Sequence, residues 1–131
     1  MNNLPAVSPR LALMIGGIAA TVFGLALLVF PSSMLSSFGL AAPTEATVLS
    51  RDVGATLIGL GVINWMARGA TGQALRAILV GNVVVQALEL VVNLGEFIGG
   101  QLPGQALGGL LIHLVLGAVF VLAMRPSSSA A

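Results

Sequence analysis

Four long apolar segments, separated by short stretches rich in Gly, Pro, Ser or charge, dominate the hydrophobic pattern of the chain. A helix of about 20 residues spans the roughly 30 Å core of a bilayer. The four segments are residues 11–30, about 46–67, about 75–98 and about 106–124. We therefore predict an all-α membrane protein. It is a single domain over residues 1–131, an antiparallel bundle of four transmembrane helices followed by a disordered tail at 126–131.

The stretches between the segments predict where the helices begin and end. Residues 31–42 are a connector that fits either a short interfacial helix or a plain loop. Thr44 is the expected N-cap of the second helix, with Glu45 in its first turn. A cleaved signal peptide is the alternative for 11–30, but its apolar region is too long for one. We expect a retained helix.

The third segment carries a regular stripe of polar residues. Its members are spaced four, three, four and three residues apart: Asn82, Gln86, Glu89, Asn93 and Glu96. This spacing keeps residues on one face of a helix. Glu89 falls halfway, near the expected bilayer midplane, where an ionised group facing lipid costs about 2.5–3.5 kcal/mol. We predict that this polar stripe faces the bundle interior or another subunit, and we interpret Glu89 as a functional residue.

Residues on the other segments have depths that match members of the stripe. His113 lies at about the depth of Glu89, so the two could share a proton or form a buried ion pair. At the outer mouth, Arg51 and Asp52 lie at about the depth of Glu96, and Arg51 with Glu96 is the better match.

Two further residues are expected towards the inner side. Asn64 is expected to meet Asn82, and Arg68 marks the cytoplasmic interface with Trp65. The alternative for the three asparagines, Asn64, Asn82 and Asn93, is interhelical hydrogen bonding without further function.

The composition excludes several classes of protein. Hydrophobic residues make up 57 % and charged residues 7 % of the chain, against roughly 25 % charged in a soluble domain. The five arginines are scattered singly, so no nucleic-acid partner is expected. The chain has no Cys, and no helical spacing suits a His and carboxylate metal site, so we predict no metal and no cofactor.

The charges orient the chain. With four spans, the side that holds both termini carries four basic residues and no acid: Arg10, Arg68, Arg76 and Arg125. The other side carries the acids Glu45, Asp52 and Glu96, with Arg51 as its base. The positive-inside rule therefore places both termini in the cytoplasm, and we predict a location in the bacterial cytoplasmic (inner) membrane.

The layout of the whole chain resembles the DoxX-like group of small four-helix bacterial membrane proteins. The stretches that carry the resemblance are "FGLALLVFP", "RDVGATLIGLGVINWMARG" and "LLIHLVLGAVF". The resemblance implies a four-helix antiparallel bundle and transfers no activity.

Three functions fit these features. The first is binding or translocation of a small molecule or proton, with Glu89 as the protonatable centre, His113 as its partner, and Gln86 and Asn93 as hydrogen-bonding neighbours. The second is an accessory or assembly subunit whose stripe docks on another chain. The third is a quinone- or lipid-linked membrane enzyme, and an enzyme is the less favoured class. The expected partners are the lipid bilayer and either further copies of this chain or other subunits of a membrane complex.

Overall fold

The computed structural model describes residues 7–125, which form helices and contain no β-strand. The elements are α1 (Pro9–Val29), α2 (Pro31–Ser37), α3 (Thr44–Ala67), α4 (Gly72–Ile98), the 3₁₀ helix η1 (Gly104–Ala106) and α5 (Leu107–Ala123). Four helices are long and apolar enough to cross a membrane: α1, α3, α4, and η1 continued by α5. The predicted all-α class and the four long apolar helices are confirmed. The tail predicted at 126–131 lies outside the described residues.

The helix ends differ from the predicted ones by up to three residues. α1 begins at Pro9 because the hydroxyl of Ser8 accepts a hydrogen bond from the backbone N–H of Leu11 at 3.1 Å. The prediction of Thr44 as an N-cap is wrong. Pro43 occupies that position, and Thr44 is the first residue of α3.

The connector after α1 contains a short helix, α2, so it is not a plain loop, and the interfacial position of this helix stays a prediction. Pro31 stands at its first turn, where the missing N–H costs nothing. Gly39 ends it with φ +73, and the N–H of Leu40 bonds back to the carbonyl of Leu35 at 3.0 Å. The turn at Gly39 packs beside Pro103 and Gln105, on the connection between α4 and α5.

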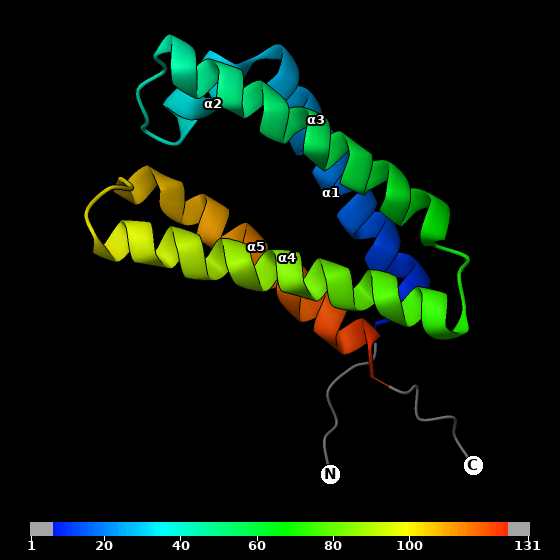
Figure 1. Ribbon diagram of the computed structural model, residues 1–131. Helices are drawn as coiled ribbons and strands as arrows, with labels where there is room; N and C mark the ends of the chain where they lie inside the picture. The colour runs from blue at the N-terminus through cyan, green and yellow to red at the C-terminus, as the bar shows by residue number, and fades with distance from the viewer. Residues whose placement is uncertain (1–6, 126–131) are drawn as a thin grey trace.

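The long helices form two hairpins that diverge from each other (Figure 1). α1 packs along α3 to form the first hairpin, and α4 packs along α5 to form the second. α3 and α4 touch at few places. In Figure 1 the hairpins lie closest near the α3–α4 connection and separate towards α2.

Glycines bring the two helices of the first hairpin into backbone contact. A Cβ atom on Gly24 would lie 2.6 Å from the carbonyl oxygen of Gly54, and one on Gly54 would lie 2.7 Å from that of Gly24. A Cβ on Gly61 would lie 2.8 Å from the carbonyl oxygen of Gly17. We call these four residues the glycine seam. Only glycine permits this approach, which is a common way for helices to associate in lipid.

A small apolar cluster joins the hairpins at the end where the α3–α4 connection lies. Its buried members are Ala12 and Leu13 from α1, Leu79 from α4, and Phe120 and Ala123 from α5. The Phe120 ring is fully buried and fills the space that a side chain at position 16 would need, because residue 16 is a glycine. The cluster therefore holds one end of the two hairpins together, while the Gly39 turn meets the α4–α5 connection at the other.

Candidate functional site

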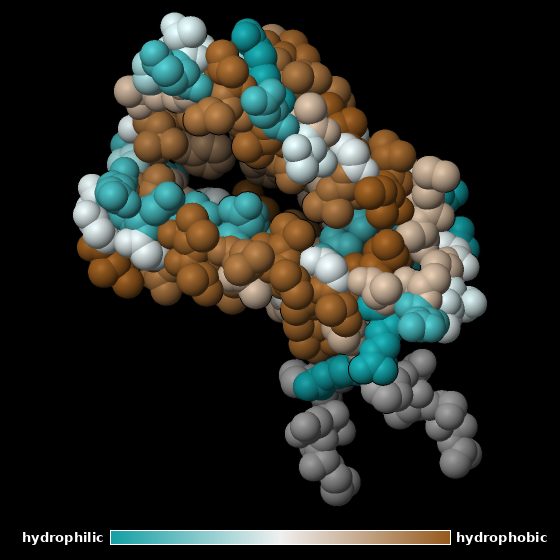
Figure 2. Space-filling model, viewed as in Figure 1, coloured by the Kyte–Doolittle hydropathy of each residue, from teal (hydrophilic) through white to brown (hydrophobic). Residues whose placement is uncertain are grey.

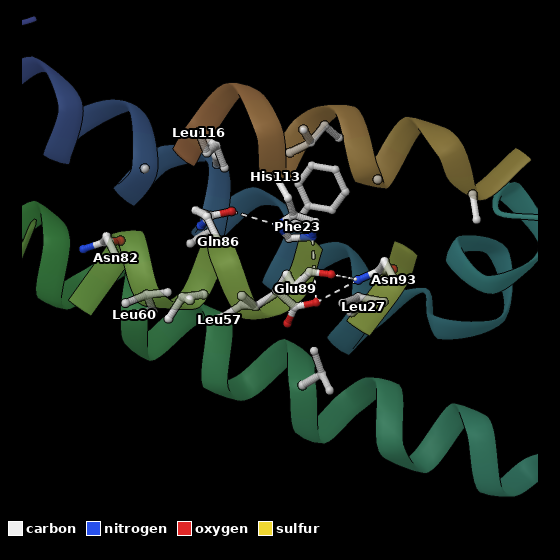
Figure 3. Close-up of a pocket in the computed structure, with 18 of the residues that line it drawn as sticks. Phe23, Leu27, Leu57, Leu60, Asn82, Gln86, Glu89, Asn93, His113 and Leu116 are labelled. Carbon is white, nitrogen blue, oxygen red and sulfur yellow. Dashed lines mark hydrogen bonds and ion pairs between the residues drawn. The ribbon is translucent and has the colours of Figure 1, made fainter. Parts of the chain in front are cut away.

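A cavity of about 250 Å³ lies between the two hairpins. In Figure 2 a hollow between the hairpins has hydrophilic residues along its edge and apolar residues around it. The cavity is bounded by α1 and α3 on one side and by α4 and α5 on the other, as Figure 3 shows. Its wall is mainly apolar, with Phe23 and Leu27 from α1 and Leu57 and Leu60 from α3 among the lining residues.

The polar stripe forms the polar part of this wall. Four of its members line the cavity: Asn82, Gln86, Glu89 and Asn93. All four project from α4, and His113 faces them from α5 (Figure 3). Glu96, the fifth member, does not line the cavity. The predicted inward orientation of the polar stripe is therefore correct for four of its five residues.

Gln86 fixes the orientation of the His113 ring. The Oε1 atom of Gln86, which is buried, lies 2.7 Å from Nδ1 of His113. An amide oxygen can only accept a hydrogen bond, so Nδ1 must donate and carry a proton. In the neutral ring, Nε2 is then left as an acceptor.

Glu89 lies next to that free ring nitrogen. Its Oε2 atom is 3.9 Å from Nε2 of His113, which is too far for a hydrogen bond. The side-chain amide of Asn93 donates to Oε2 at 3.1 Å and to the backbone carbonyl of Glu89 at 2.7 Å. The predicted pairing of Glu89 with His113 is therefore present as a close approach. It is not fully buried, because 49 % of the Glu89 side chain is exposed.

Asn64 and Asn82 form a reciprocal amide pair between the hairpins. Nδ2 of Asn64 donates to Oδ1 of Asn82 at 2.8 Å, and Nδ2 of Asn82 donates to Oδ1 of Asn64 at 2.7 Å. Asn64 is fully buried and Asn82 is 3 % exposed. The predicted contact of Asn64 with Asn82 is confirmed, and it ties α3 to α4 on the side of the cavity nearer the α3–α4 connection.

The predicted contact between Arg51 and Glu96 is wrong. Within residues 7–125, no ion pair joins Arg51 or Asp52 to Glu96, and none of the three lines the cavity. Arg51 and Asp52 are exposed on α3. The reason is the divergence of the hairpins, because Arg51 lies about 20 Å along α3 from Asn64, where α3 and α4 meet.

Arg68 also lies outside the cavity. Its guanidinium stacks over the ring of Trp65, 4.5 Å from the centroid, and donates to the carbonyl oxygen of Trp65. This arrangement is consistent with the predicted interfacial position of both residues.

The apolar half of the cavity was not anticipated from the sequence. Phe23, Phe38 and Phe120 line it, together with leucines from α1 and α3. Nothing in the pattern marks them, because apolar residues cover every face of these helices. The one local hint is Gly16, whose missing side chain makes room for the Phe120 ring.

The described part of the chain contains no group of three or more His, Asp and Glu residues that could hold a metal ion. Comparison of the chain with protein-family models, with curated proteins and with solved structures gives no match. The resemblance to the DoxX-like group therefore stays a prediction, and the chemistry of the cavity is the basis for any function.

Proposed function

We propose that this chain crosses the bacterial cytoplasmic membrane four times, with both termini in the cytoplasm, and binds a small molecule in the cavity between its hairpins. The four long apolar helices support the membrane location. The arginines near the two ends of the chain and around the α3–α4 connection support the orientation. Binding, rather than a purely structural role, is supported by Glu89.

Glu89 carries the proposal because a carboxyl group at this depth needs a compensating partner. It lies near the middle of α4, and half of its side chain is exposed towards the hollow between the hairpins. In a bilayer, that opening has to be filled by water, a ligand or another chain, since an ionised group facing lipid costs several kcal/mol. A concave, mainly apolar wall with a few convergent polar groups is typical of a small-molecule site.

The expected ligand has an apolar body and one polar group. The body would lie against Phe23, Leu57 and Leu60, and the polar group would reach Glu89 and His113. Translocation of a proton or of the ligand through the membrane would also use Glu89, and it would start from the bound state.

An accessory role in a membrane complex is the second candidate. One observation favours it, namely that α3 and α4 leave the cavity open between the hairpins. A helix of another subunit or of a second copy of this chain could close that opening.

Two glycines on α5 allow a controlled test of the cavity. Gly109 lines it and Gly108 does not, and a Cβ on either would meet no atom within 4 Å. Gly109→Leu should therefore fill the cavity, whereas Gly108→Leu should add the same side chain outside it. Native mass spectrometry of gently extracted protein should show a discrete small mass on the wild type and on Gly108→Leu, and its loss from Gly109→Leu.

The same spectra separate the two candidates. A small mass that persists on Gly109→Leu, or no retained mass on any of the three proteins, would contradict binding in this cavity. Other chains bound in a fixed ratio would instead favour the accessory role.

A further inference from the structure

We infer that the cavity selects a lipophilic cation, namely a protonated amine that has at least two N–H donors and an apolar body. This inference rests on the proposed function, because it names the class of molecule that the same cavity binds. It is based on the free hydrogen-bond acceptors and the charges of the polar residues that line the cavity.

The carboxylate of Glu89 has unused acceptor capacity. An ionised carboxylate offers about four lone-pair sites. In the described part of the chain, Glu89 Oε2 accepts one side-chain hydrogen bond, from Asn93, and Oε1 accepts none. The neighbouring Nε2 of His113 is 3.9 Å away and does not fill these sites.

The cavity also lacks a fixed positive charge. No arginine lines it in the described range, and the chain contains no lysine. His113 is the one lining residue that could become cationic, yet its Nδ1 already bonds to Gln86 and its Nε2 stands apart from Glu89. A ligand that brings its own positive charge would therefore complete the site.

The distance between the two acceptors suits an ammonium group. Glu89 Oε2 and His113 Nε2 are 3.9 Å apart. One donor nitrogen can therefore lie about 2.9 Å from both atoms at once, within hydrogen-bond distance of each. Bridging them requires two N–H or O–H donors on one atom. An ammonium has three donors, whereas an alcohol or phenol has one, so a hydroxyl can satisfy only one acceptor.

The apolar wall suits the rest of such a molecule. The rings of Phe23, Phe38 and Phe120 line the cavity. Aromatic faces attract cations as well as apolar surface, and the attraction increases when the site is desolvated. The wall would therefore hold an alkyl or aryl body, and its aromatic rings would add to the attraction for a positive charge.

Two small isosteric probes test the inference. 4-Phenylbutylamine is an ammonium ion at neutral pH, as alkyl amines are, and 4-phenylbutan-1-ol has the same number of heavy atoms and no charge. Binding of each is measured by calorimetry to the protein in lipid nanodiscs, with empty nanodiscs as the reference for partition into lipid. The amine should bind the wild type at least about tenfold more tightly than the alcohol, because hydrogen bonds to charged groups are the strong ones.

Two variants then test whether Glu89 causes the preference for the amine over the alcohol. Glu89→Gln should reduce amine binding about tenfold or more and reduce alcohol binding much less, so that the preference for the amine is lost. The matched control is Glu96→Gln, which removes a carboxylate from the same helix outside the cavity and should behave as the wild type. The wild-type preference for the amine does not depend on any variant, so it tests the inference even if Glu89→Gln folds poorly.

The outcomes separate this inference from the function on which it rests. Equal binding of both probes, abolished by Gly109→Leu, would keep the cavity as a binding site and overturn the selection of a cation. Binding that Gly109→Leu does not change for either probe would overturn the cavity itself. Amine selectivity that survives Glu89→Gln would also contradict the role given to Glu89.

Discussion

At the scale of single residues, two amide side chains determine where the hairpins meet. Asn64 and Asn82 each donate to and accept from the other, and Asn82 also donates to the carbonyl of Ile78 at 2.9 Å. Every polar atom of the pair that lies away from solvent has a partner. Loss of the Asn82 amide would leave the amide of Asn64 buried without a partner among residues 7–125, which is more costly than losing both.

Asn82→Ala should therefore lower the free energy of unfolding by about 1–2 kcal/mol. Unfolding by denaturing detergent in mixed micelles measures this loss. Asn93→Ala is the control, because its amide bonds only within α4.

The pairing itself is tested by a double-variant cycle. Asn64→Ala combined with Asn82→Ala should cost no more than the worse single variant, since the two residues are coupled. Losses that simply add would show that the two amides act independently.

At the scale of helices, the two hairpins are built differently. The glycine seam brings the backbones of α1 and α3 together, and Thr21 donates to the carbonyl of Gly17 at 2.8 Å beside it. α4 and α5 have no such seam, and Gly117 on α5 faces the side chain of Gln86 at an ordinary contact distance. The first hairpin therefore provides the closely packed apolar wall of the cavity, and the second carries the polar groups that line it.

Two glycines of α3 give a matched test of the seam. A Cβ on Gly61 would collide with Gly17 and Thr21, whereas one on Gly59 would meet no atom within 4 Å. Gly61→Ala should cost about 1–3 kcal/mol through overpacking. Gly59→Ala should be neutral or stabilise by up to about 1 kcal/mol through helix propensity. Thermal unfolding of the two variants in the same detergent compares them, and equal shifts would contradict the seam.

At the scale of the whole molecule, the hairpins pack together near the α3–α4 connection and diverge towards α2, where the turn at Gly39 still reaches the α4–α5 connection. The apolar cluster around Phe120 joins them at one end, and the Gly39 turn touches Pro103 and Gln105 at the other. The cavity occupies the space between these contacts. The charges follow the same axis, with arginines at the end where α1 begins and α5 finishes.

The proposed orientation predicts the behaviour of reporter fusions. Green fluorescent protein fused to the C-terminus should fluoresce, and alkaline phosphatase at the same point should be inactive, because the four arginines hold that end in the cytoplasm. Insertion of phosphatase between residues 99 and 105 should make it active. The reverse pattern would contradict the orientation.

The sequence predicted the helices and the polar stripe well, and the contacts between helices less well. Apolar length and polar spacing depend on local geometry, so α4 and its inward face could be predicted from the sequence alone. Asn64 and Asn82 were matched by depth, which works near a short connection because the two helices are still close there.

Matching residues by depth gave a wrong contact between Arg51 and Glu96, because equal depth does not show how far apart two helices are at that level. The apolar cluster around Phe120 holds the hairpins together at one end, and the sequence does not distinguish its residues from the other apolar residues of the four helices. The apolar half of the cavity was missed for the same reason.

The order in which the protein is made determines when Asn64 can pair with Asn82. Ribosomal synthesis proceeds from the N-terminus, so the α1–α3 hairpin is complete before Asn82 has been added to the chain. If the chain crosses the membrane as proposed, Asn64 enters it before Asn82, its hydrogen-bond partner, has been made. The hydrogen bonds of Asn64 to Asn82 form only when α4 is in place. The buried amide of Asn64 therefore favours association of the first hairpin with α4.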